Sequence, residues 1–194
     1  SAAQIFVATL EEDIRNAQRN LQSLDAAACE QAVDAILAAD RVFIIGFGAS
    51  GFLAGMLQRG LCMHLHSVES LAGPGGVSHA ARQMSRMTSK DLVIAIGFPR
   101  YLADTVTLAD AARQAGVPVL ALTDKPTSPL APTASVAPYA VSARRLLPNS
   151  ETAALGLIEA LSAAVAYRAS NSAAAAAPVR PPVMPWLVHG VGKR

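Results

Sequence analysis

The sequence predicts an α/β domain in which a parallel β-sheet lies between two layers of helices. Two short runs, Arg41–Gly46 and Asp91–Ile96, are apolar almost throughout, which is typical of strands buried on both faces of a parallel sheet. Segments with helical periodicity follow these runs, as expected of βαβ units with right-handed crossovers. The chain has 194 residues, of which 52% are hydrophobic, and is therefore long and apolar enough to bury a full core.

Residues 1–40 are expected to form helices that pack on the domain or on a dimer partner. Phe6, Leu10 and Ile14 recur every four residues, with charged residues on the opposite face, and this spacing predicts a helix over residues 3–24. Asp25 is a suitable N-cap for a second helix, which is expected to stop near Asp40.

From residue 41 to residue 170, predicted strands and helices alternate and form the main domain. Strands are predicted at residues 41–46, 65–69, 91–96, 117–122 and 134–141, and the second and fifth of them have the weakest patterns. Helices are predicted at about residues 50–63, 78–87 and 102–115, and from Ser150 onward. The expected architecture is therefore a three-layer α/β/α domain with a five-stranded parallel sheet.

Residues 171–194 differ in composition and are expected to form a proline- and alanine-rich C-terminal tail. Residues 173–177 are all alanine, and the prolines from Pro178 to Pro185 prevent the preceding helix from continuing. The tail also contains Trp186, the only tryptophan of the chain. Two interpretations remain open: an extended tail, or a strap docked on a partner subunit.

Charge and hydropathy exclude several classes of protein. The net charge is +2, and the charged residues of both signs are scattered without a basic stripe, so this chain by itself is not expected to bind DNA tightly. No run approaches the roughly 18 apolar residues that a membrane span needs, and no signal peptide is recognisable. Cys29 and Cys62 lack CxxC spacing and are expected to be buried, reduced thiols. We therefore expect a soluble, cytoplasmic protein.

Ligands of open parallel sheets bind at the carboxyl ends of the strands, where neighbouring crossovers leave on opposite faces. The two clearest predicted strands lead into the loops 46–51 and 97–101, which would then form one crevice. The first loop brings backbone N–H groups to a helix start and suits a phosphate or carboxylate. In the second loop, Arg100 could hold an anion in a bidentate manner, and Tyr101 could stack and donate a hydroxyl. The candidate ligand-binding residues are Gly48, Ala49, Ser50, Gly51, Gly97, Arg100 and Tyr101.

Two further interpretations of these loops stay open. Arg100 could instead be a solvated loop residue, and Tyr101 could pack on the following helix. The first loop also matches GxGxxG, and Glu69 lies 18 residues beyond Gly51, close to where a dinucleotide-binding fold has its ribose-binding acid. A small dinucleotide-binding protein is therefore a third hypothesis, although the strand before Glu69 is poor.

The sequence resembles the SIS (sugar isomerase) domain at several of these positions. It is most similar to the effector domain of RpiR-family bacterial transcriptional regulators. The resemblance rests on the GxGxS turn at Gly46, Gly48 and Ser50, on the strand end Ala95-Ile96, and on residues 112–123 and 128–131. It covers about residues 5–168. It implies a flavodoxin-like strand order, a homodimer or higher homo-oligomer, and binding of phosphosugars without a cofactor, by either enzymes or sensors.

The chain departs from the family in its second loop. The family signature there is SxSGxT, whose hydroxyls hold the sugar phosphate. Its three hydroxyl positions fall on Gly97, Pro99 and Leu102, none of which carries a hydroxyl. Ser50 remains, with Arg100 as a replacement anchor, so a carboxylate or another phosphorylated metabolite also stays open as the ligand.

The resemblance also names a candidate catalytic residue. Isomerases with this fold use a glutamate near the start of a late helix as general base, which here corresponds to Glu151; alternatively, Glu151 only stabilises the helix N-terminus. His64 and His66 have no carboxylate or cysteine at metal spacing, so no metal site is expected. The first hypothesis is a non-catalytic effector domain that reaches DNA only through a helix-turn-helix domain outside this chain. The second is a phosphosugar aldose–ketose isomerase.

Overall fold

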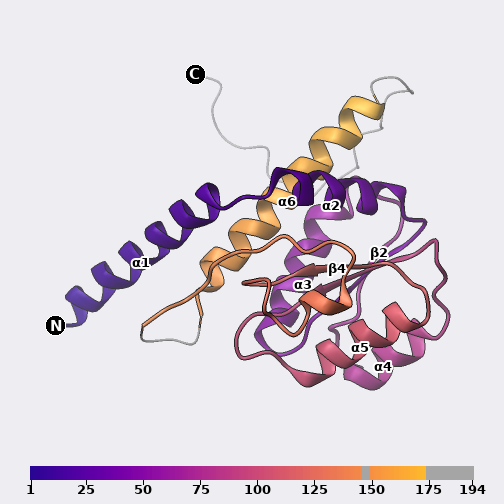
Figure 1. Ribbon diagram of the computed structural model, residues 1–194, viewed down its shortest axis with the longest axis horizontal. Coiled ribbons are helices and arrows are strands. Elements are labelled where there is room, and N and C mark those ends of the chain that lie inside the picture. Colours follow the sequence, from indigo (N-terminus) through magenta and orange to yellow (C-terminus); the bar gives the residue numbers. More distant parts are fainter. Residues whose placement is uncertain (146–148, 174–194) are drawn as a thin grey trace, which may run out of the picture.

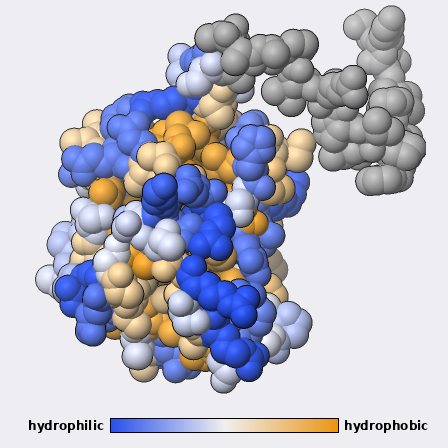
Figure 2. Space-filling model, turned by 90° about the vertical axis from the view of Figure 1, so that its right-hand side faces the viewer, coloured by the Kyte–Doolittle hydropathy of each residue, from blue (hydrophilic) through white to orange (hydrophobic). Residues whose placement is uncertain are grey.

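The computed structural model describes residues 1–145 and 149–173, so the expected tail lies outside the described residues from residue 174 onward. None of the described helices is long and apolar enough to cross a membrane. The face of the domain seen in Figure 2 is a mixture of hydrophilic and hydrophobic residues, consistent with the scattered charges of the sequence.

Two helices precede the sheet, as predicted. Helix α1 (Ala2–Gln22) begins with a capping box formed by Ser1 and Gln4, and α2 (Ala26–Ala38) begins at Asp25, whose carboxylate accepts the N–H of Ala28 at 3.0 Å. Helix α1 reaches out from the body of the domain (Figure 1). Its apolar side chains are mostly exposed, with Phe6 at 73%, so the amphipathic pattern marks a face that the described residues do not cover.

The sheet has four parallel strands in the order β2-β1-β3-β4. The central strands β1 (Val42–Ile45) and β3 (Leu92–Ile96) are buried along their whole length, and β4 (Val119–Leu122) is buried as well. The strand β2 (Val68–Ser70) is short and lies at the edge. This order agrees with the flavodoxin-like arrangement that the resemblance implies.

The expected fifth strand is not a regular strand, so the five-stranded prediction is corrected to four strands. Residues 134–141 make only two isolated parallel bridges to the sheet, between Leu120 and Val136 and between Thr123 and Tyr139. Pro138 lies between the two bridges and has no N–H to donate, so a continuous ladder cannot form there. The short 3-10 helix η1 (Ala131–Thr133) precedes this segment.

Helices cover both faces of the sheet (Figure 1). Helices α2, α3 (Ala49–Leu61) and α6 (Glu151–Ala173) pack on one face, against a cluster that includes Ile44, Ile94 and Leu120. Helices α4 (Gly76–Met84) and α5 (Ala103–Gln114) belong to the opposite face, where the cluster includes Ile45 and Val93. The crossover through α3 therefore leaves β1 on one side and the crossover through α5 leaves β3 on the other, which makes β1 and β3 the topological switch point.

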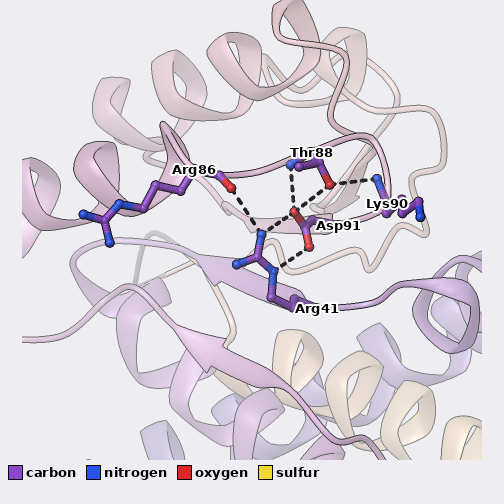
Figure 3. Close-up of polar contacts among 5 residues, drawn as sticks. All are labelled: Arg41, Arg86, Thr88, Lys90 and Asp91. Carbon is purple, nitrogen blue, oxygen red and sulfur yellow. Dashed lines mark hydrogen bonds and ion pairs between the residues drawn. The ribbon is translucent and has the colours of Figure 1, made fainter.

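At the amino ends of β1 and β3, Arg41 and Asp91 form a bidentate ion pair (Figure 3). Arg41 Nε lies 2.8 Å from Asp91 Oδ1, and Arg41 Nη2 lies 2.7 Å from Oδ2. The Asp91 carboxylate also accepts the N–H of Thr88 at 2.7 Å, and Arg41 donates to the carbonyl of Arg86 at 3.2 Å. The hydrogen bond from Arg41, opposed by burial and helped by Thr88, holds the pKa of Asp91 below its usual value.

The two cysteines are free thiols, as expected, but only one of them is partly buried. Cys62 is exposed at the end of α3, so the expectation of a buried thiol is wrong there. Burial, with the nearby carboxylates of Asp25 and Glu30, raises the pKa of Cys29, which keeps that side chain in its thiol form.

Candidate functional site

A cavity of about 640 Å³ opens between the carboxyl ends of β1 and β3. Three segments form its walls: the loop after β1 with the start of α3, the loop after β3 with the start of α5, and the segment that leads into α6. The lining residues are Phe47, Gly48, Ala49, Ser50, Gly97, Phe98, Pro99, Arg100, Leu102, Thr105, Arg144, Asn149 and Glu151. The two loops that the sequence singled out therefore lie together at the switch point.

The first wall depends on two glycines. A Cβ on Gly46 would lie 3.0 Å from the carbonyl oxygen of Ile96, so the end of β1 can approach β3 this closely only without a side chain. Gly48 has φ +60°, a left-handed conformation that favours glycine, and it is the N-cap of α3. No side chain caps α3, so its first-turn N–H groups are available to an anion beside the hydroxyl of Ser50.

The second wall is built on Gly97. A Cβ on this residue would lie 2.5 Å from Cδ1 of Leu130, which is completely buried, so a larger residue here requires Leu130 to shift. Arg100 follows on the loop and is exposed, and it forms no ion pair with any described residue. Thr105, on the first turn of α5, adds a hydroxyl-bearing side chain that is 2% exposed.

Two of the expected site residues do not line the cavity. The hydroxyl of Tyr101 donates to Oδ1 of Asp124, just beyond β4, and burial together with this carboxylate raises the pKa of Tyr101 to about 12. Gly51 lies within α3, where its N–H donates to the carbonyl of Gly48 at 3.0 Å and closes the first turn of the helix. Tyr101 and Gly51 therefore belong to the two loops but do not reach the surface of the cavity.

The third wall comes from the segment before α6. Glu151, the first residue of α6, is exposed and accepts a hydrogen bond of 3.0 Å from Nδ2 of Asn149. Arg144 also lines the cavity, and its Nη2 lies 2.5 Å from Oδ2 of Asp13 on α1. Ser150 caps α6 by accepting the N–H of Ala153 at 3.1 Å.

The carboxylate of Asp13 connects α1 to this wall. It accepts hydrogen bonds from Ser150 at 2.6 Å and from Thr152 at 3.2 Å, in addition to the ion pair with Arg144. Burial acts to raise the pKa of Asp13, but the contacts with Arg144, Ser150 and Thr152 outweigh it and lower the pKa. Asp13 is therefore a charged anchor of α1 on the domain.

Sequence reasoning missed three polar residues of the cavity: Thr105, Arg144 and Asn149. Thr105 could have been found, because it follows Leu102 by three residues and so shares a helix face with it. Arg144 lies beside Arg145 in the sequence and belongs to no motif that points to the cavity. Its position depends on a contact with Asp13, 131 residues away in the sequence, and nothing in the local pattern signals that contact.

The arrangement suits a small anion that also carries hydroxyl groups. Two guanidinium groups, Arg100 and Arg144, and one carboxylate, Glu151, line a cavity that also presents Ser50 and the uncapped start of α3. Within the described residues no group of three or more His, Cys, Asp and Glu could hold a metal ion. His64 and His66 are exposed, and neither they nor His79 are among the described residues that line the cavity.

A parallel sheet in the order β2-β1-β3-β4, with helices on both faces and a polar cavity at its switch point, defines a flavodoxin-like ligand-binding domain. The family model of the SIS domain matches residues 35–167. The chain therefore belongs to the SIS domain family.

Solved structures agree with this assignment. The chain is 31% identical to the sugar isomerase domain of an RpiR transcription factor from Sphaerobacter thermophilus, with a TM-score of 0.81 and coverage of 89% of this chain and 95% of that one. It is 20% identical to the Vibrio vulnificus NanR protein complexed with ManNAc-6P, with a TM-score of 0.75, 88% of this chain and 66% of that one being covered. Phosphoheptose isomerase GmhA from Neisseria gonorrhoeae is 16% identical, with a TM-score of 0.72 and coverage of 85% and 99%. No curated protein matches the chain.

Proposed function

We propose that this chain is the effector-binding SIS domain of an RpiR-like bacterial transcriptional regulator, and that it senses a phosphosugar or another small anionic metabolite. The observation that carries the proposal is the cavity at the switch point, where Arg100 and Arg144 lie near the uncapped start of α3. The 31% identity to the sugar isomerase domain of an RpiR transcription factor supports the regulatory assignment. The ManNAc-6P complex of NanR, which shares the fold, supports a sugar phosphate as ligand.

The walls suggest how such a ligand would lie. Its anionic group would accept the first-turn N–H groups of α3 and the guanidinium of Arg100, which replaces the missing hydroxyls at Gly97, Pro99 and Leu102. Its hydroxyl groups would face Asn149 and Glu151 on the third wall. Arg100 is exposed, and its planar guanidinium group can bind a carboxylate in the same bidentate manner as a phosphate. The same wall would therefore also accept an organic acid.

The cavity favours a sensor over an isomerase. Glu151 is the only carboxylate among the described lining residues, it is exposed, and Asn149 donates to it. No described histidine lines the cavity to assist it. The likeness to phosphoheptose isomerase concerns the fold alone. An isomerase remains the second candidate, because Glu151 does occupy the cavity wall; proton exchange from a phosphosugar in deuterated water, lost in Glu151→Gln, would establish it.

The dinucleotide hypothesis finds little support. Glu69, the expected ribose-binding acid, is exposed on the edge strand β2 and is not among the lining residues. The helix α3 does begin after a glycine-rich turn, but this turn also serves a simple anion.

We further propose that the regulator works as a homodimer or higher homo-oligomer and contacts DNA through a helix-turn-helix domain outside this chain. The exposed apolar side chains of α1 support an assembly, because large apolar patches on a protein surface usually mark an interface. The most exposed of these are Phe6, Leu10, Ile14 and Leu21.

A thermal-shift screen tests the proposed function. We expect ManNAc-6P and other sugar phosphates, or small organic acids, to raise the melting temperature, and the matching unphosphorylated sugars to leave it unchanged. Arg100→Ala should abolish the shift, whereas Arg82→Ala, which changes an exposed arginine of α4 outside the cavity, should preserve it. If no anionic compound stabilises the protein, or if NAD alone does, the proposed function is wrong.

A further inference from the structure

Arg144 lies between the ligand cavity and helix α1. Its side chain lines the cavity, and it also lines a second, apolar hollow of about 590 Å³ against α1. The side chain is only 12% exposed. The Nη2 nitrogen of the guanidinium donates to Asp13 at 2.5 Å, while Nε is buried and has no hydrogen-bond partner in the described part of the chain. The same planar group thus has one donor that is satisfied and one that is not.

We propose that Arg144 couples anion binding in the cavity to the attachment of α1: its Nε donates to the bound anion while Nη2 remains on Asp13. The proposal rests on the function proposed above and adds its regulation. A guanidinium is planar and rigid, so an acceptor that fixes Nε also fixes the direction in which Nη2 points. A buried N–H without an acceptor is unfavourable, and an anion in the cavity would remove this unfavourable state.

The contacts of α1 show why Arg144 would matter to it. The apolar side chains of α1 are largely exposed, so polar contacts make much of its attachment to the domain. These contacts run along one side of the helix and reach the segment 141–145 and the start of α6. They are the bonds of Asp13 with Arg144, Ser150 and Thr152, the bond of Asn16 with the Ala143 carbonyl at 3.0 Å, the bonds of Asn20 with Val141 at 2.6 and 3.3 Å, and the bond from the backbone N–H of Arg145 to Glu12 at 3.4 Å, which a change of the Arg145 side chain leaves in place.

The coupling is reciprocal. If an anion on Nε strengthens the attachment of α1, then an attached α1 strengthens anion binding by the same factor. Asp13 lies near the middle of α1. A ligand in the cavity would therefore change how firmly this helix, which leads toward the amino end of the chain, is attached to the domain. A ligand held by Arg100 and α3 alone would leave α1 unchanged.

Hydrogen–deuterium exchange of the α1 amides, with binding of ManNAc-6P followed in parallel by calorimetry, tests this coupling. In the wild-type protein we expect ManNAc-6P to slow exchange around Asp13 by about 5-fold or more, the lower end of typical couplings. Asp13→Asn should still bind ManNAc-6P, with affinity lower by about the same factor, but α1 should no longer respond. Arg144→Gln should weaken binding and also lose the response. Arg145→Gln, at the exposed neighbouring arginine, should behave as wild type.

Each outcome decides a separate point. Binding of ManNAc-6P without any change in α1 overturns the coupling and leaves the proposed function standing. An α1 response that persists in Asp13→Asn also overturns the coupling, since Asp13 is its first contact on α1. If neither ManNAc-6P nor inorganic phosphate binds, this inference fails, while the thermal-shift screen of other sugar phosphates and organic acids decides the proposed function. Should either variant fail to fold, the exchange experiment on the wild-type protein still decides.

Discussion

The carboxylate of Asp91, with only 1% of its side chain exposed, is bound by two nitrogens on one edge of the Arg41 guanidinium, Nε and Nη2 (Figure 3). Arg41 itself is partly open to solvent and also lies over the ring of Phe43, 5.2 Å from its centroid. The pair joins the amino ends of the two central strands, at the opposite end from the ligand cavity. Because the buried carboxylate is neutralised by this one cation, the stability of the fold should be sensitive to the loss of either partner.

We expect Asp91→Asn to lower the free energy of unfolding by about 2 kcal/mol, because the single amide oxygen cannot accept from Nε, Nη2 and the Thr88 N–H together. Urea unfolding followed by circular dichroism measures the change. Asp110→Asn is a matched control: Asp110 pairs with Arg113 on the surface of α5, and its loss should have a much smaller effect. Equal effects of the two variants would contradict the role of Asp91.

Stability should also fall in acid. Asp91 and Asp13 both have lowered pKa values in the folded state, so their contribution is present above the ordinary carboxyl pKa of about 3.9 and is lost as the pH falls through that value toward the folded pKa values. Melting temperatures measured between pH 7 and pH 3 should therefore decline most steeply below about pH 4. Asp91→Asn should show a shallower decline, and a decline identical to that of the wild type would be evidence against the assignment.

Tyr101 should ionise far above an ordinary tyrosine. Its pKa is raised to about 12 by burial and by the carboxylate of Asp124, so the neutral hydroxyl stabilises the fold below about pH 10 and this contribution is lost as the pH rises through about 12. An absorbance titration of the three tyrosines should show one late step, which Tyr101→Phe removes. If the late step survives in Tyr101→Phe, another tyrosine is responsible.

Gly97→Ala should damage the wall of the cavity. The new methyl group would lie 2.5 Å from Leu130 Cδ1, and accommodating it should cost about 1–3 kcal/mol. Gly55→Ala is the control: nothing lies within 4 Å of its Cβ position on α3, and it should stabilise the protein by up to about 1 kcal/mol. Thermal unfolding of both variants compares their stability directly. An unchanged melting temperature in Gly97→Ala would show that the Leu130 side chain can move away from the new methyl group.

The parts of the fold that local patterns determine were predicted well. The runs at β1 and β3 are buried on both faces, and their alternation with helices correctly placed the loops 46–51 and 97–101 at one switch point. The errors arise where the outcome depends on distant partners. The strand expected at 134–141 fails at Pro138, and the hydroxyl of Tyr101 turns to Asp124 instead of the cavity.

The first helix shows the same limit in another form. Its periodicity correctly grouped Phe6, Leu10 and Ile14 on one face, but periodicity cannot say what covers such a face, and in the single chain all three are exposed. Arg144 was missed as a cavity residue for a similar reason, because only the ion pair with Asp13 brings it there.

The ion pair of Arg41 and Asp91 joins the two central strands at the end of the sheet opposite the cavity. Residues of the cavity loops can therefore change without altering this ion pair, and Gly97–Leu102 borders a well-formed cavity although none of its three signature positions carries a hydroxyl. Gly97 and Phe98 are buried and belong to the scaffold, whereas Arg100 and Leu102 are exposed, so exchanging these two residues should change the ligand preference proposed for the cavity while the architecture persists.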